Sequence, residues 1–338
     1  MMLRMILLLA MMLSAVTTAQ RPSSLLLVSL RINQSTSGGV LAIVDPATGK
    51  VIDRIPIAED PHGLTASPDG RFAFIAHSNG NSVSVIDLAA RKELHRVQLG
   101  TGSEPHDIQV SGGKVYFTVE GYKAVARYDP ATRTVDWWQG TGQNGTHMMA
   151  VSKDGNRIFT ANNTGNSVSV LERAAGNASS WNVTTIPAGK LPEGIGMSPD
   201  GKQVWVVNKA AGGGITILDT ATKKVVQTLD VTTNHANRID FTPDGRLAIV
   251  LDEEGDLVVM DATARKEIKR IPVMANSLLI APDGLHAYAT VAPGFQKSPK
   301  IEGVGNHVAV IDLKTLELTR RIEVGNPNPD TIAWVPAP

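Results

Sequence analysis

Three histidines recur at a spacing that suggests a shared chemical role. His62 and His147 each stand seven residues before the Asp of an Asp-Gly turn, and His106 aligns with them through the apolar residues that follow it. Imidazole and carboxylate groups bind zinc, copper, iron or manganese without thiolates, and the chain has no Cys. The same position is polar in every repeat, and the full register is Asp330, His62, His106, His147, Glu193, Asn237 and Asn276. We predict that the metal ligands are His62, His106, His147, Glu193 and Asp330.

Two other interpretations of these polar positions remain open. A solvated rim would present the same residue types, bonded to backbone amides or to trapped water. Metal-free acid/base chemistry would use the imidazoles directly. We predict that His77, Asn237 and Asn276 contribute to ligand binding, and that His235 and Glu193 are the candidates for moving a proton. Other polar residues form a collar in the loops on the same face, at His77-Ser-Asn79, Glu120, Asn162-Asn163, Lys209 and Asp252-Glu-Glu254.

A sequence repeat must position these residues. An acidic residue at the start of a turn, as in Asp45-Pro-Ala-Thr-Gly-Lys50, recurs at intervals of 42 to 51 residues. This is the period of a four-stranded propeller blade. The seven acids are Asp45, Asp87, Asp129, Glu172, Asp219, Asp261 and Asp312. The sequence therefore predicts an all-β fold, a seven-bladed β-propeller of four-stranded antiparallel blades.

Strand and turn signals divide each repeat further. Alternating apolar runs such as Ser82 to Ile86, Ser167 to Leu171 and His307 to Ile311 precede the acids and indicate third strands. Asp-Gly turns at Asp69, Asp154, Asp200, Asp244 and Asp283 indicate hairpins. An Asp side chain that hydrogen-bonds its own turn explains these acids better than calcium binding does.

The two ends of the chain predict how the ring closes. Only three strands precede the second repeat, over residues 25–30, 40–44 and 51–57, whereas a lone strand at 331–335 has no hairpin partner. We expect that C-terminal strand to complete the first blade. This pairing would remove both open sheet edges and make residues 20–338 a single domain.

Residues 1–19 are predicted to be a secretory signal peptide. Arg4 precedes an apolar run from Met5 to Val16, and small residues precede a cleavage position after Ala19. The run is shorter than the roughly 20 residues that span a bilayer, which disfavours a membrane anchor. We expect an exported protein, periplasmic or extracellular, with no transmembrane segment in the mature chain.

The charge balance and the sequence motifs disfavour nucleic acid and nucleotides as binding partners of this protein. The chain has 32 Lys plus Arg and 32 Asp plus Glu, which gives no basic face for nucleic acid. Gly140 to Gly145 matches G-x-G-x-x-G but joins two strands without a following helix, so we expect no nucleotide cofactor. The loop at 292–306 is long enough to be a lid. The expected partner is a small molecule or an envelope protein.

The repeat motifs resemble a known family. Ser-Pro-Asp-Gly at 198–201, Val-Trp-Val-Val-Asn at 204–208 and Ser-Val-Ser-Val-Ile-Asp at 82–87 are similar to the YVTN-type β-propeller repeats of bacterial envelope proteins. Pro-His-Gly at 61–63 and Pro-His-Asp at 105–107 resemble lactonase-like and streptogramin-lyase-like propellers. The resemblance implies a binding or scaffold protein whose His-rich channel mouth holds a divalent metal or a small ligand. The alternative is a metal-assisted lactonase-like hydrolase or lyase that uses the same His and Glu residues.

Overall fold

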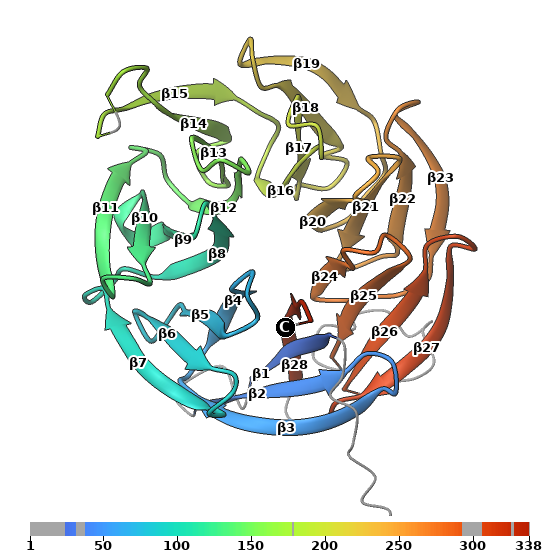
Figure 1. Cartoon of the computed structure of the whole chain (residues 1–338). Coiled ribbons are helices and arrows are strands. Elements are labelled where there is room, and N and C mark those ends of the chain that lie inside the picture. The colour runs from blue at the N-terminus through green and yellow to red at the C-terminus, as the bar shows by residue number, and fades with distance from the viewer. Residues whose placement is uncertain (1–23, 32–37, 178, 293–305, 326–327, 338) are drawn as a thin grey trace, which may run out of the picture.

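The structure is a ring of seven antiparallel sheets of four strands each, which confirms the predicted propeller (Figure 1). This computed structural model describes residues 24–31, 38–177, 179–292, 306–325 and 328–337. The predicted signal peptide and nearly all of the predicted lid loop lie outside the described residues. Among the described residues, no helix has the length and apolar character needed to cross a membrane.

Each blade contributes one inner strand to the centre of the ring. The inner strands of blades one to seven are β28 (Asn328–Val335), β4 (Pro61–Ala66), β8 (Pro105–Ser111), β12 (Thr146–Val151), β16 (Pro192–Met197), β20 (Ala236–Phe241) and β24 (Ser277–Ile280). The second strands, in the same order, are β1 (Leu25–Arg31), β5 (Phe72–His77), β9 (Lys114–Val119), β13 (Arg157–Asn162), β17 (Gln203–Asn208), β21 (Leu247–Asp252) and β25 (His286–Val291).

The remaining strands form the body and the outer edge of the blades. The third strands are β2 (Gly39–Asp45), β6 (Ser82–Asp87), β10 (Ala124–Asp129), β14 (Ser167–Arg173), β18 (Ile215–Asp219), β22 (Leu257–Asp261) and β26 (His307–Asp312). The outer strands are β3 (Lys50–Ile57), β7 (Lys92–Gln98), β11 (Thr134–Gly140), β15 (Trp181–Pro187), β19 (Lys224–Leu229), β23 (Lys266–Ile271) and β27 (Glu317–Glu323). A single 3₁₀ turn, η1 (Glu120–Tyr122), is described.

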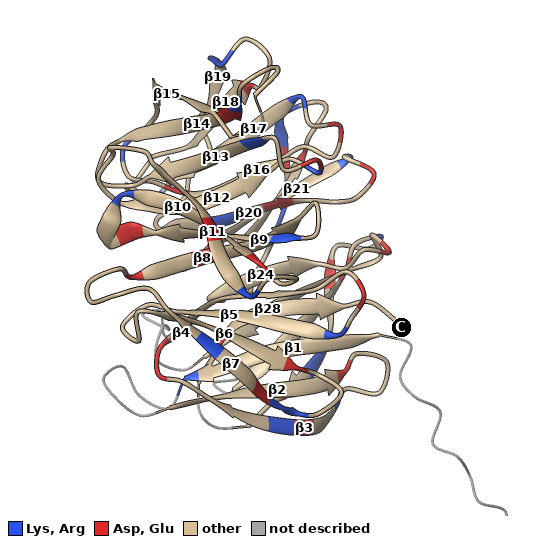
Figure 2. Ribbon diagram, turned by 60° about the vertical axis from the view of Figure 1, so that its left-hand side comes forward, with Lys and Arg blue, Asp and Glu red and all other residues tan. Residues whose placement is uncertain are grey.

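Burial along the strands explains their sequence patterns. Second and third strands such as β5 and β6 are buried on both faces, because each blade packs between two neighbours. Phe74 of blade two and Phe117 of blade three, for example, belong to one apolar cluster. Outer strands alternate exposed and half-buried positions, as β7 does. Figure 2 shows that basic and acidic residues occur together on outer strands such as β3 and β7.

The ring closes in the predicted way. β28 pairs antiparallel with β1, so the C-terminal strand supplies the inner strand of the blade that β1, β2 and β3 begin. Ser29 and Thr331 reinforce this junction with a buried hydrogen bond of 2.9 Å between their hydroxyl groups.

The acidic residues of the Asp-Gly turns hydrogen-bond their own turns, as predicted. The carboxylate of Asp69 accepts hydrogen bonds from the Ser67 hydroxyl at 2.5 Å and from the Arg71 amide at 3.1 Å.

Candidate functional site

The predicted polar register lies at the channel mouth because it occupies a common place on the inner strands. His62, His106, His147, Glu193 and Asn237 are each the second residue of their strand. All five fall within a shift of pairing register between the inner and the second strand. Such a bulge releases one residue from the ladder and re-aims its side chain. The bulges therefore turn these side chains out of the sheets.

Glycines allow neighbouring inner strands to approach closely at this level. A Cβ atom at Gly63 would collide with the carbonyl oxygen of His106, and one at Gly194 would collide with the carbonyl oxygen of Asn237. At Gly63 the close approach places His62 beside His106, and His147 extends the row. The ring centroids of His62 and His106 are 4.3 Å apart, and those of His106 and His147 are 3.8 Å apart.

His147 is the charged member of this row. Its Nδ1 donates to Oε2 of Glu120 at 2.9 Å, and its Nε2 donates to Oε1 of Glu193 at 3.1 Å. Burial acts to lower the pKa of His147, but the two carboxylates outweigh burial and raise its pKa to about 9. Burial acts to raise the pKa of Glu193, but His147 and Lys209 outweigh burial and lower its pKa to about 2. The result is an imidazolium held between two carboxylates.

The other two histidines are neutral. Burial and the Arg31 guanidinium lower the pKa of His62 to about 3. Burial and the charge of His147 hold the pKa of His106 well below its usual range. His62 accepts a hydrogen bond from Nη2 of Arg31 at 3.3 Å. Nδ1 of His106 is buried and has no hydrogen-bond partner among the described residues.

The row continues around the mouth as a chain of polar contacts. Nζ of Lys209 donates to Oε1 of Glu193 at 2.8 Å and lies 3.9 Å from Oε2 of Glu253. Glu253 in turn accepts hydrogen bonds from Asn237 and from Nδ1 of His235, the latter at 2.8 Å. Within the part of the chain that is described, the Oδ1 atoms of Asn237 and Asn276 are buried without a partner. Together with Nδ1 of His106, they give the mouth three buried polar atoms that a ligand can satisfy.

Two of the predicted metal ligands serve other contacts. Oδ2 of Asp330 accepts a hydrogen bond from Nη2 of Arg31 at 2.6 Å, and burial raises the pKa of Asp330 to about 6 despite that neighbour. His62 also faces Arg31. The atoms close enough to share one ion belong to His106, Glu120 and His147, whose ligand atoms all lie within 4.8 Å of one another. Glu120 was predicted only as a residue of the polar collar.

His77 does not reach the mouth. It is fully buried at the end of β5, where Nδ1 contacts the carbonyl oxygen of Glu59 at 3.0 Å and Nε2 contacts the Ser84 hydroxyl at 2.8 Å. Asn162 and Asn208 occupy the same last position of their second strands and bond within their own blades in a similar manner. Burial lowers the pKa of His77 to about 4. Its two nitrogens are therefore committed to the blade.

Comparisons with known proteins agree on the propeller architecture. Residues 37–178, from β2 to β14, match the sequence model of a family described as outer membrane protein assembly factor BamB. This match spans less than half of the chain. No curated protein matches the sequence. The matched family is described as neither YVTN-type nor lactonase, so that resemblance rests on the repeat motifs alone.

Solved structures with the same architecture share little sequence with this chain. A functionally unknown protein from Desulfotomaculum acetoxidans DSM 771 has a TM-score of 0.75 at 14% identity, covering 94% of this chain and 100% of its own. Hydrazine synthase of Kuenenia stuttgartiensis has a TM-score of 0.63 at 17% identity, covering 89% and 99%. The dihydro-heme d1 dehydrogenase NirN has a TM-score of 0.62 at 18% identity, covering 93% and 66%. At these identities the similarity concerns the fold alone.

Proposed function

We propose that this protein is an exported binding protein of the cell envelope whose channel mouth binds one divalent transition metal ion. The candidate ions are zinc, copper, iron and manganese, which accept nitrogen and oxygen ligands. The observation that carries the proposal is the group of His106, Glu120 and His147, with one ligand atom from each within 4.8 Å of the others. Glu193, which contacts Nε2 of His147, adds a second carboxylate beside the group.

The protonation states of the group fit this role. Metal binding needs a neutral imidazole nitrogen, and His106 is neutral and buried with a free Nδ1 among the described residues. His147 carries a proton on each ring nitrogen, and Nδ1–H bonds to Glu120 while Nε2–H bonds to Glu193. A divalent ion would replace the proton on the nitrogen that binds it, and its charge would compensate the carboxylates.

An envelope location is supported by two independent features. The N-terminal 19 residues have the composition of a signal peptide. Residues 37–178 match a family of outer membrane assembly factors. When the full chain is expressed in a bacterial host, N-terminal sequencing of the protein from the periplasmic fraction should therefore begin at Gln20. Cytoplasmic protein that keeps Met1 would refute export.

Elemental analysis tests the metal site. Protein purified from the periplasm and the variant His106→Asn/His147→Asn should be compared by plasma mass spectrometry. The wild type should carry one equivalent of metal, and the variant should carry none. His286→Asn is the matched control, because this half-exposed histidine at the start of β25 lies beside Asp283, Tyr288 and Asp312 and is not part of the metal group.

The variant must also be shown to fold. His106 and His147 lie outside the apolar clusters between the blades, so the far-UV circular dichroism of the variant should match that of the wild type. Equal metal content in the wild type and a folded variant would overturn the proposal. So would a wild type that, after removal of metal by a chelator, binds none of zinc, copper, iron and manganese when titrated with each.

A hydrolase is the second candidate, and one contact favours it. Nδ1 of His235 bonds to Oε2 of Glu253 at 2.8 Å, which orients the ring and leaves Nε2 to accept a proton. His235 is about one-third exposed, so a substrate can reach it. Metal-loaded protein should then hydrolyse simple lactones, and His235→Gln should abolish the rate while leaving the metal content unchanged. Absence of turnover in the wild type would refute catalysis and leave the binding role intact.

A further inference from the structure

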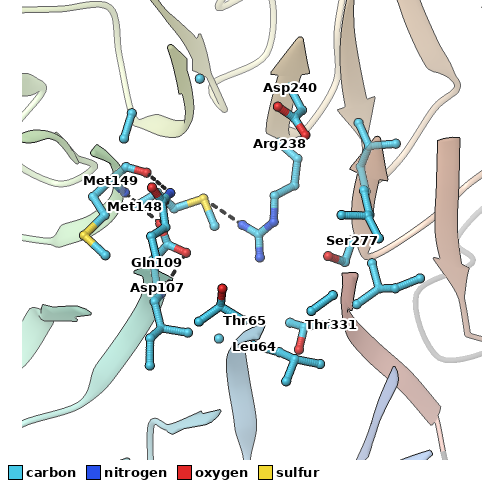
Figure 3. A pocket seen from close by; sticks show the side chains of 18 of the residues that line it. Leu64, Thr65, Asp107, Gln109, Met148, Met149, Arg238, Asp240, Ser277 and Thr331 are labelled. Atoms are coloured by element: carbon cyan, nitrogen blue, oxygen red, sulfur yellow. Dashed lines mark hydrogen bonds between the residues drawn. The ribbon is translucent and has the colours of Figure 1, made fainter. Parts of the chain in front are cut away.

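Below the mouth, the channel itself forms a cavity that contains an arginine. The cavity has a volume of about 480 Å³ and is lined by all seven inner strands. This size is typical of small-molecule sites. Figure 3 shows the side chain of Arg238, from β20, reaching into the middle of the cavity.

The guanidinium of Arg238 has few partners for its five N–H donors. Nη1 lies 2.7 Å from the sulfur of Met148 and 3.5 Å from the carbonyl oxygen of Asn237. A thioether is only a weak acceptor. Among the described residues, no carboxylate oxygen lies within 4.0 Å of this guanidinium. Most of its donors therefore face the cavity.

The nearest carboxylates of the cavity are engaged elsewhere. Asp107 accepts hydrogen bonds from the backbone amides of Met149 and Ile108, both at 2.9 Å. Asp240 accepts a hydrogen bond from the amide of Phe241 at 2.8 Å. These acids do not reach Arg238, but their charges oppose the entry of a multiply charged anion such as phosphate. Among anions, the cavity therefore admits one with a single charge more readily than one with several.

The walls supply both hydroxyl groups and apolar surface. Figure 3 shows the hydroxyls of Thr65 and Ser277 turned toward the guanidinium. Neither hydroxyl has a hydrogen-bond partner within the described part of the chain. Met148, Leu278 and Ile332 line the same cavity with apolar atoms. The site thus combines a planar cation, two polar anchors and an apolar wall.

We propose that the channel binds a small monocarboxylate with a short aliphatic chain. Its carboxylate lies on the guanidinium of Arg238, which matches a carboxylate with two parallel hydrogen bonds. Thr65 and Ser277 donate to the same oxygens, and the aliphatic chain contacts Met148 and Leu278. No residue of this site belongs to the group of His106, Glu120 and His147, although His62 of the mouth also lines the cavity.

Isothermal titration calorimetry with butyrate tests the proposal. The protein is first freed of metal with a chelator, so that the result does not depend on the metal site. Butyrate should bind with one-to-one stoichiometry, whereas butyramide, which is of similar size and uncharged, should bind at least tenfold more weakly. Arg238→Gln should weaken butyrate binding by roughly 10- to 100-fold, because a charge-assisted pair is lost. Arg246→Gln is the matched control, since Arg246 is exposed on the same blade.

Each outcome decides the proposal. Equal binding of butyrate and butyramide, or equal binding by the wild type and Arg238→Gln, would overturn it. Tighter binding of phosphate than of butyrate would also overturn the assigned ligand class. If Arg238→Gln fails to unfold cooperatively, Arg238→Lys replaces it. Lys keeps the charge but loses the paired geometry, so it should bind butyrate with intermediate affinity.

Discussion

Arg31 and Asp330 form a salt bridge of 2.6 Å between two strands that lie at opposite ends of the chain. Arg31 is the last residue of β1, and Asp330 belongs to β28. The same guanidinium donates to His62, the first histidine of the row. The contact that closes the ring therefore also orients a residue of the channel mouth.

Removal of the closing strand should destabilise the whole molecule. Deletion of residues 331–338 takes away most of β28 and leaves β1 as an open edge with buried apolar side chains such as Leu26 and Leu27. We expect a loss of the cooperative thermal transition seen by circular dichroism, or aggregation before it. Deletion of only 336–338, which keeps β28 intact, is the control. Equal melting temperatures of the two proteins would refute closure by β28.

The charge of His147 predicts a specific dependence of stability on pH. Its pKa is raised in the folded state from 6.5 to about 9, so its contribution is fully present below pH 6.5 and is lost as the pH rises through 9. The free energy of unfolding in urea should therefore fall by on the order of 3 kcal/mol between pH 6.5 and about pH 9.5.

The variant His147→Gln isolates this effect. It should be less stable than the wild type at pH 6.5 and should show a much flatter profile above that pH. His286→Gln, which alters a half-exposed histidine, should keep the wild-type profile. A wild-type profile in His147→Gln would show that this imidazolium does not carry the dependence.

The affinity for zinc should also depend on pH. A metal ion bound by His147 displaces a proton that is held with a pKa of about 9, whereas His106 is already neutral. The dissociation constant should therefore fall about tenfold for each pH unit between about pH 6.5 and pH 8.5. Competition titration with a chromophoric chelator measures this slope. A flat profile in that range would exclude His147 as a ligand.

Asp240 is expected to lower the stability of the protein at neutral pH. Burial raises the pKa of this carboxyl to about 6, so its contribution to stability is lost as the pH rises from 3.8 through 6. Asp240→Asn should increase the free energy of unfolding at pH 7.5 by about 1–2 kcal/mol, after allowance for partial exposure and a weakened hydrogen bond. Glu317→Gln, on the exposed side of β27, should leave it unchanged. A less stable Asp240→Asn protein would show that the ionised carboxylate is needed by its backbone partners.

The fold could be predicted because its determinants are local and repeated. The alternating run at Ser82 to Ile86 and the turn acid Asp87 specify a strand and its end within six residues, and the structure places β6 there. The amide hydrogen bonds that Asp87 accepts from Ala89 and Ala90 are made within its own turn. Ring closure could be predicted by counting strands, because the strand at 331–335 has no adjacent strand in the sequence with which to form a hairpin.

The site was predictable only in part, because side-chain convergence depends on neighbouring blades. The register identified the inner-strand positions of His106 and His147 correctly. It did not reveal Arg31, whose long side chain reaches Asp60, His62 and Asp330 from the end of a second strand. The charge of His147 depends on Glu120 and Glu193, which come from two different blades. The sequence of a single repeat therefore cannot predict that these two carboxylates contact His147.

The pairing of β1 with β28 also sets an order of events during synthesis. The partner of Arg31 is 299 residues away, so the first blade to leave the ribosome is the last to be completed. Blades two to seven each contain all their strands in one contiguous segment and can form as they emerge. The edge of β1 has no partner until β28 has been synthesised, and any product terminated before residue 328 lacks the segment that would cover it.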